Sequence, residues 1–153
     1  MSITAFDSEQ LEAAKVHDLG DLTVGIPNVS FDEIGTSRGT ANFSIRGLGI
    51  NSSIPTIDPT VGVFVDGVYM GTNAMVLYDA FDLESVEVLR GPQGVLFGRN
   101  VIGGAILLNT RAPTNQYEAR VRSVVEGDGK APNVYVLGTL NAPLTDTLAA
   151  LQL

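Results

Sequence analysis

The sequence contains no cysteine and a single histidine, His17. The absence of cysteine excludes disulfides and thiolate metal sites, and one imidazole cannot build a histidine metal cluster. Basic residues are also few, because nine lysines and arginines stand against 17 acidic residues, which gives a net charge of −8. Binding to nucleic acid requires a clustered basic surface, so we expect no nucleic-acid partner.

Long apolar runs are absent as well. No stretch approaches the roughly 18 apolar residues of a membrane-spanning helix, and residues 1–7 lack the basic and apolar regions of a secretory signal. If the protein acts outside the cytoplasm, we expect its signal peptide to have been removed or to lie outside this chain. Charged residues make up only 17%, whereas an apolar fraction of 44% is normal for a globular protein. We therefore expect a compact domain that is covered by something else.

The N-terminal third of the chain predicts short elements. Asp7 stands three residues before Gln10, which is the spacing of a capping box, and predicts a helix that continues to Lys15. A second helical turn is expected around Asp18–Leu22, before the glycine and proline at positions 25 and 27 stop it. Short strands are expected at residues 3–6, 29–31 and 42–46.

The middle of the chain alternates between strands and glycine-rich turns. Asp66-Gly67 favours a tight hairpin turn within residues 61–69. The apolar run Ala105–Asn109 has the length and composition of a central strand that is buried on both faces. A further strand is expected at residues 86–89, a helical turn at 73–80 and a glycine-punctuated turn at 91–100.

The pattern changes after Pro113. From Tyr117 to Glu126 apolar and charged residues alternate, as in a strand of an outer-membrane barrel that faces lipid on one side. A second strand is expected at 133–141. We therefore place a boundary near Pro113, with an α+β domain at residues 1–113 and the start of a barrel at residues 114–153.

Three motifs follow one another along the chain. They read Asn-Phe-Ser-Ile-Arg-Gly at 42–47, Val-Gly-Val-Phe-Val-Asp-Gly-Val-Tyr at 61–69, and Glu-Ser-Val-Glu-Val-Leu-Arg-Gly-Pro-Gln-Gly-Val-Leu-Phe-Gly-Arg-Asn at 84–100, followed by Val-Ile-Gly-Gly-Ala-Ile-Leu-Leu-Asn-Thr. Over residues 2–113 the sequence resembles the plug of TonB-dependent outer-membrane receptors, which import siderophores, vitamin B12 and related nutrients. The resemblance implies a compact α+β plug with a small mixed sheet and short helices. The first strands of an antiparallel outer-membrane β-barrel would follow it.

Two arginines, Arg46 and Arg90, each follow an apolar strand and precede a glycine. The resemblance implies that both pair with glutamates on the inner barrel wall. The alternative is that they are solvated or pair with nearby carboxylates such as Asp82, Glu84 or Glu87.

Glycines and a proline punctuate the third motif. Glycine permits positive φ and close backbone approach, and proline fixes φ at the start of a turn. We therefore expect a structural turn built by Gly91, Pro92, Gly94, Gly98, Gly103 and Gly104.

The loop from Leu48 to Pro59 is the candidate ligand site that the resemblance implies, with Leu48, Asn51, Ser52 and Ser53 as its named members. A dinucleotide loop is a poor alternative, because the third glycine of that motif would fall on Ser52 and no helical pattern follows. We find no catalytic, cofactor or metal signature and expect that the chain is not an enzyme.

The resemblance implies a plug that gates a barrel in the outer membrane of a Gram-negative bacterium and helps to bind an iron–siderophore complex or similar nutrient. TonB is the expected partner, although Met1 stands directly before the first strand and leaves no room for a TonB box. Residues 114–153 have room for only about two to four barrel strands, so we expect no transport by this chain alone. The alternative is a free-standing soluble binding or adaptor domain, or a fragment without function.

Overall fold

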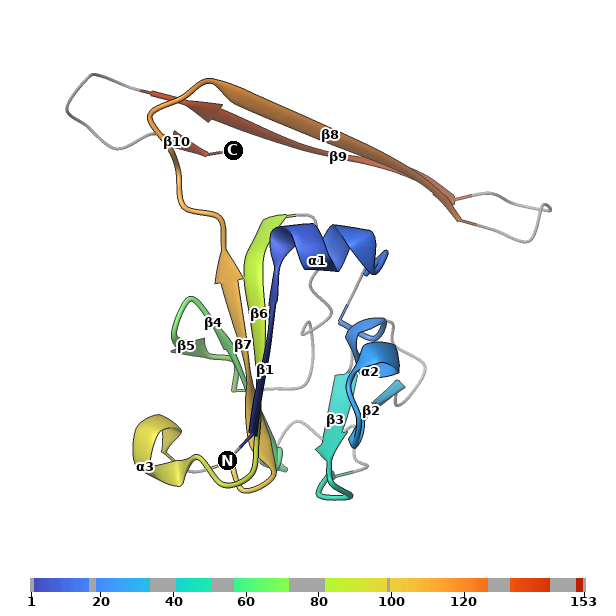
Figure 1. Cartoon of the computed structure of the whole chain (residues 1–153), viewed down its shortest axis with the longest axis vertical. Helices are drawn as coiled ribbons and strands as arrows, with labels where there is room; N and C mark the ends of the chain where they lie inside the picture. The colour runs from blue at the N-terminus through green and yellow to red at the C-terminus, as the bar shows by residue number, and fades with distance from the viewer. Residues whose placement is uncertain are drawn as a thin grey trace. The chain divides into compact units, whose positions relative to one another are not determined.

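The computed structural model describes residues 2–16, 19–33, 41–50, 57–71, 82–98, 100–126, 133–143 and 151–152. The chain divides into two compact units, Met1–Thr110 and Arg111–Leu153 (Figure 1). Among the described residues, no helix is long and apolar enough to cross a membrane. The helical turn expected at 73–80 lies outside the described residues, as does His17.

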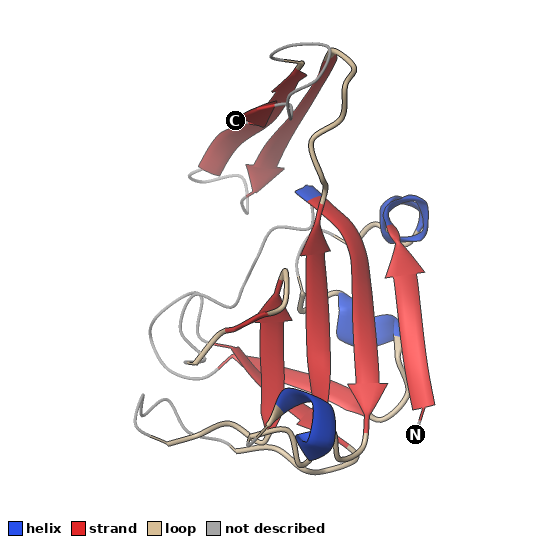
Figure 2. Cartoon of the chain, turned by 90° about the vertical axis from the view of Figure 1, so that its left-hand side faces the viewer, coloured by secondary structure: helices blue, strands red, loops and turns tan. Residues whose placement is uncertain are grey.

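The first unit is built on a five-stranded mixed sheet (Figure 2). Its strand order is β1 (Ser2–Asp7), β6 (Leu83–Arg90), β7 (Gly104–Thr110), β4 (Val61–Val65) and β5 (Val68–Tyr69). Strand β7 lies in the centre, antiparallel to β6 and parallel to β4, and Ile106 and Leu108 on it are fully buried. The predicted central strand is therefore confirmed. The predicted hairpin is confirmed too, because Asp66 and Gly67 both have positive φ between β4 and β5.

Helix α1 (Ser8–Ala13) begins as the sequence predicts. The Gln10 N–H donates to Asp7 Oδ1 at 2.8 Å, and the Asp7 N–H donates to Gln10 Oε1 at 3.1 Å, so the capping box is complete. Helix α2 (Leu22–Gly25) lies one turn later than the helical turn expected at Asp18–Leu22. The position of α2 corrects that prediction: burial of Leu22 and Ile26 in the core selects the later segment, and Gly25 becomes its last residue.

The main core lies on one face of the sheet. Helices α1 and α2 and the two-stranded sheet of β2 (Val29–Glu33) and β3 (Ala41–Ile45) cover this face (Figure 1). Ile45 and Leu19 are fully buried there against the sheet residues Val86 and Ile106. The strands predicted near residues 29–31 and 42–46 are thus confirmed, and Arg46 lies just beyond the end of β3.

A smaller apolar cluster occupies the opposite face. The predicted glycine turn contains a short helix, α3 (Gly94–Phe97), which the sequence analysis did not predict. The ring of Phe97 packs against Phe64 with their centroids 4.9 Å apart, and the Gln93 N–H donates to Val101 O at 3.0 Å. These long-range contacts stabilise the helical turn, and the local sequence contains no helical pattern that predicts it.

The second unit is a hairpin of β8 (Glu118–Glu126) and β9 (Asn133–Ala142), extended by β10 (Leu151–Gln152). The two long strands pair in register from Glu118 opposite Asn141 to Glu126 opposite Asn133. Val121 and Val125 are exposed and share one face, which confirms the alternating pattern read from the sequence. The functional boundary near Pro113 stays a prediction.

Candidate functional site at the arginine-bearing strand ends

Arg46 lies in a tight turn that ends β3. Its φ is +55° and that of Gly47 is +79°, and the Leu48 N–H donates back to Ile45 O at 3.0 Å. The Arg46 N–H in turn donates to Asn28 O at 2.8 Å. A left-handed conformation is unusual for a residue with a side chain. Two backbone hydrogen bonds therefore hold the turn in which Arg46 lies.

The side chain of Arg46 is exposed and makes no hydrogen bond or ion pair with another described residue. It borders a hollow of about 190 Å³. The hollow is lined by Asn28, Val29, Ser30, Ser44, Arg46 and Gly47. The guanidinium and the hydroxyls of Ser30 and Ser44 are hydrogen-bond donors of the kind that a carboxylate accepts.

Arg90, at the end of β6, differs because its guanidinium is already bonded within the unit. Its Nη2 donates to Ser2 Oγ at 2.8 Å and to Thr4 Oγ1 at 3.0 Å, both on β1. Its Nη1 donates to Pro27 O at 3.2 Å. The bonds of Arg90 therefore go to uncharged oxygens, which corrects the alternative of a local carboxylate partner.

The two arginine-bearing strand ends meet around the Pro27–Asn28 turn and Gly104. The turn accepts one bond from each arginine, at Pro27 O from Arg90 and at Asn28 O from Arg46. A Cβ at Gly104 would collide with Leu89 O and lie 2.7 Å from Ile45 Cδ1. Since Gly104 also has a φ of +154°, only glycine permits this approach of the two strand ends.

The other residues of the predicted structural turn differ in their surroundings. Gly91 has a φ of +108°, and a Cβ there would lie 4.0 Å from Arg46 Nη1. Gly98 has positive φ, Gly103 packs on Leu48, and Pro92 is exposed. A Cβ at Gly94 would meet open space.

Residues 1–105 match the model of the TonB-dependent receptor plug domain. The chain belongs to this family.

Two relatives cover almost all of the plug chain but are much longer. The iron-regulated outer membrane virulence protein of Vibrio cholerae is 30% identical over an alignment of length 161 that covers 97% of this chain and 23% of the relative. The pesticin receptor of Yersinia pestis is 30% identical over 150 residues, 97% of this chain and 21% of the receptor. The chain thus spans less than a quarter of the length of these relatives.

The solved ferric yersiniabactin uptake receptor of Yersinia pestis has a similar fold. The TM-score is 0.76 at 27% identity, and the similarity covers 96% of this chain and 22% of the receptor. Because the similarity includes both units, the fold is an α+β plug followed by the first antiparallel strands of a plug–barrel receptor.

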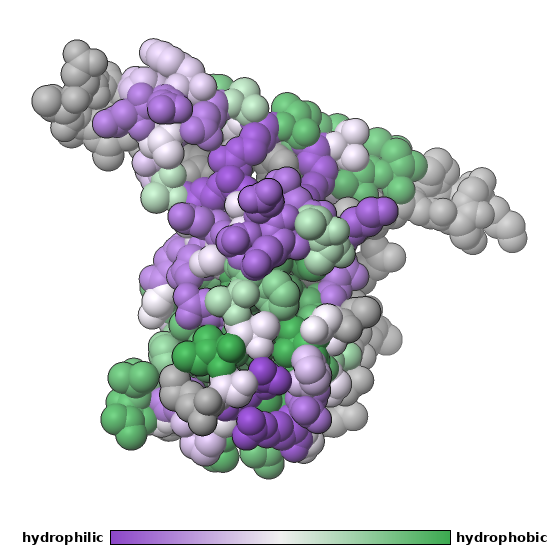
Figure 3. Space-filling model, viewed as in Figure 1, coloured by the Kyte–Doolittle hydropathy of each residue, from purple (hydrophilic) through white to green (hydrophobic). Residues whose placement is uncertain are grey.

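The plug also exposes an apolar turn that the sequence analysis missed. Val95 and Leu96 on α3 are largely exposed, although Phe97 beside them packs inward. Figure 3 shows this patch as the green surface over α3. Two neighbouring branched apolar residues inside a glycine-bounded turn were the only signal in the sequence, and they could equally have been buried.

The predicted ligand loop of the plug is only partly described. Leu48 is exposed and packs beside Gly103, two residues after Arg46. Asn51, Ser52 and Ser53 lie outside the described residues, so their role stays a prediction. Within the described part of the chain, no three His, Asp or Glu side chains gather in a way that could hold a metal ion.

Proposed function

We propose that residues 1–113 are the plug and residues 114–153 the beginning of the barrel of an outer-membrane transporter for an iron–siderophore complex or a similarly scarce nutrient. The observation that carries this proposal is the match of the plug-domain model to residues 1–105. The names of the relatives support the class of cargo, since one is an iron-regulated outer-membrane protein and another a ferric yersiniabactin uptake receptor.

In this proposal Arg46 contacts a carboxylate on the inner wall of the barrel. Arg46 is exposed and borders a hollow lined by two serines, and backbone hydrogen bonds hold the turn in which it lies. A carboxylate in that hollow would accept charge-assisted hydrogen bonds, which are the stronger kind. The exposed Val95 and Leu96 provide an apolar contact for the same wall.

Arg90 has a double role in the same proposal. It contacts the barrel wall with the part of its guanidinium that remains accessible, and it holds β1 in place through Ser2 and Thr4. The loop from Leu48 to Pro59 contributes to the ligand site, and TonB supplies the energy for opening the plug.

A chimeric receptor tests the proposal. Residues 1–110 of this chain replace the plug of the Yersinia pestis ferric yersiniabactin uptake receptor, and the chimera is expressed in a strain that lacks its own copy. We expect the foreign plug to close the barrel, so that cells resist vancomycin as well as cells with the native receptor do. A barrel without any plug is the control, and it should admit the antibiotic.

The same chimera with Arg46→Ala sharpens the test. Loss of the proposed wall contact should raise vancomycin sensitivity part of the way toward that of the plugless barrel. A chimera that is as permeable as the plugless control, although the receptor is present in the outer membrane in equal amount, would contradict the proposed function.

A further inference from the structure

Asn141 is a buried polar residue near the end of β9, in the second unit. Only 7% of its surface is exposed, and its partner across the hairpin is Glu118, the first residue of β8. A buried amide must find hydrogen-bond partners, because its desolvation is otherwise uncompensated. Its partners therefore indicate what the residue does.

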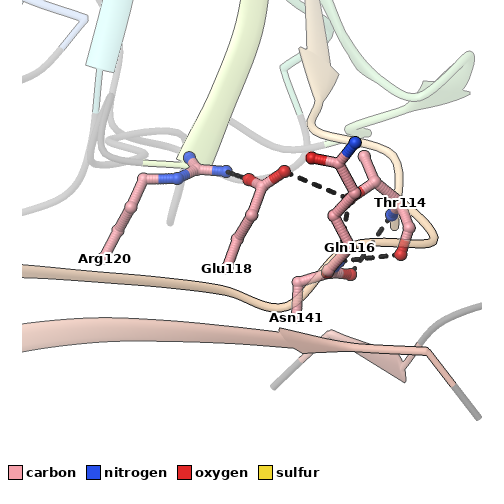
Figure 4. Close-up of polar contacts among 5 residues, drawn as sticks. All are labelled: Thr114, Gln116, Glu118, Arg120 and Asn141. Carbon is pink, nitrogen blue, oxygen red and sulfur yellow. Dashed lines mark hydrogen bonds and ion pairs between the residues drawn. The ribbon is translucent and has the colours of Figure 1, made fainter.

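Among the described residues, the hydrogen-bond partners of the Asn141 side chain all lie in the segment that leads into β8 (Figure 4). Nδ2 lies 2.8 Å from Thr114 O, 2.9 Å from Thr114 Oγ1 and 2.5 Å from Gln116 O, so its two hydrogens are shared among three acceptors. Oδ1 accepts from the Thr114 N–H at 3.2 Å. One side chain thus bonds both backbone polar groups of Thr114 and the carbonyl of Gln116.

Only a carboxamide can make this set of bonds. The Thr114 N–H requires an acceptor, while the two carbonyl oxygens require donors. The reversed amide would place Oδ1 against two carbonyl oxygens, so the network fixes the orientation of the group. Aspartate would lack the donors, and leucine would lack donors and acceptor alike. The identity of the residue is therefore tied to holding this segment.

The segment is also connected to β8 itself. The Thr114 hydroxyl accepts from Asn141 and donates to Glu118 Oε1 at 3.2 Å, and Glu118 Oε2 lies 3.5 Å from Arg120 Nη2 (Figure 4). The Glu118–Arg120 pair is partly exposed and therefore weak. The hydrogen bonds from the buried Asn141 amide therefore hold the segment more strongly than the link through Glu118 and Arg120 does.

We infer that Asn141 is a positioning residue that fixes the segment Thr114–Gln116 against β9 and so sets the path by which the chain enters β8. The segment lies immediately before the hairpin, and no regular strand pairing holds it. The side chain of Asn141 supplies the bonds that a neighbouring strand would otherwise provide. This role is independent of the cargo and of transport.

Amide hydrogen exchange in the full 153-residue chain, followed residue by residue by NMR, tests the inference in Asn141→Ala and Asn141→Asp. In both variants the Thr114 amide should exchange about tenfold faster or more, because the bonds that close the segment are lost. The amides of Val121 to Val125 should change by less than about twofold, because the strand pairing there remains. The aspartate variant keeps an acceptor but turns a carboxylate toward two carbonyl oxygens.

Asn109→Asp is the matched control. Asn109 donates a side-chain hydrogen bond to Ser85 Oγ in the first unit, so this variant should leave the Thr114 amide unchanged. Unchanged Thr114 exchange in Asn141→Ala would overturn the inference. Protection that survives in Asn141→Asp would also overturn it, since the donors would then be dispensable. So would an equal acceleration throughout β8 and β9, because Asn141 would then only stabilise the hairpin.

Discussion

Arg46 and Arg90 have similar neighbours in the sequence but different structural roles. Each follows an apolar strand and precedes a glycine with positive φ. Arg90 donates three hydrogen bonds within the plug, whereas the Arg46 guanidinium makes none to the other described residues. An arginine–glycine pair at a strand end therefore predicts the bend. It does not predict whether the guanidinium forms hydrogen bonds within the domain or with a partner outside it.

The largest effect is expected at Gly104, where the two arginine-bearing strands meet. In Gly104→Ala the new Cβ would strike Leu89 O and crowd Ile45 Cδ1, and the residue would have to keep a φ of +154°. We expect a loss of at least about 3 kcal/mol in the free energy of unfolding, measured by urea denaturation followed by circular dichroism. Gly94→Ala is the control, because open space surrounds that position on α3. Equal stability of both variants would refute the close approach.

Arg90→Ala should give the next largest effect and separate the two arginines directly. Removing the guanidinium leaves Ser2 Oγ, Thr4 Oγ1 and Pro27 O without their donor. We expect a loss of about 2 kcal/mol in the free energy of unfolding, together with faster amide exchange along β1. Arg90→Lys should recover less than half of this loss, because a single ammonium cannot reproduce the planar fork. A loss equal to that of Arg46→Ala would remove the distinction between the two residues.

The features of the fold that depend on neighbouring residues were predicted from the sequence. The apolar run that became β7, the capping box at Asp7 and the hairpin at Asp66 were readable because neighbouring residues alone determine them. The strand predicted at residues 42–46 was readable for the same reason, although β3 ends one residue earlier, at Ile45.

The contacts between residues far apart in the chain could not be predicted from the sequence. Arg90 reaches oxygens 86 and 88 positions away in the chain, and α3 exists because Phe97 packs on Phe64. The parallel pairing of β4 with β7 likewise depends on the whole sheet. Charged residues nearby in sequence were therefore a poor guide to the partners of Arg90, because tertiary contacts chose uncharged ones.

A smaller effect is expected from Thr4→Val, which removes one acceptor of Arg90 and keeps the shape of the side chain. The bond from Nη2 to Ser2 Oγ at 2.8 Å remains. We expect a loss of about 0.5–1 kcal/mol in the free energy of unfolding. In the Arg90→Ala background the same substitution should cost close to nothing, and a double-mutant cycle measures this coupling. Additive losses would mean that Thr4 and Arg90 act independently.

The smallest effect on stability is expected from Arg46→Ala. The bonds that hold the turn come from the backbone of Arg46 and Leu48, so removing the side chain leaves them in place. The free energy of unfolding of the isolated chain should change by less than about 0.5 kcal/mol, as at most surface positions. The positive φ of +55° adds little, because alanine and arginine tolerate it equally poorly. A loss as large as that of Arg90→Ala would show that the guanidinium has a partner within the plug. A small loss of stability in the isolated chain, combined with a leaky chimeric receptor, would instead show that the partner of Arg46 lies outside the plug. Arg90, by contrast, bonds Ser2, Thr4 and Pro27 within the plug.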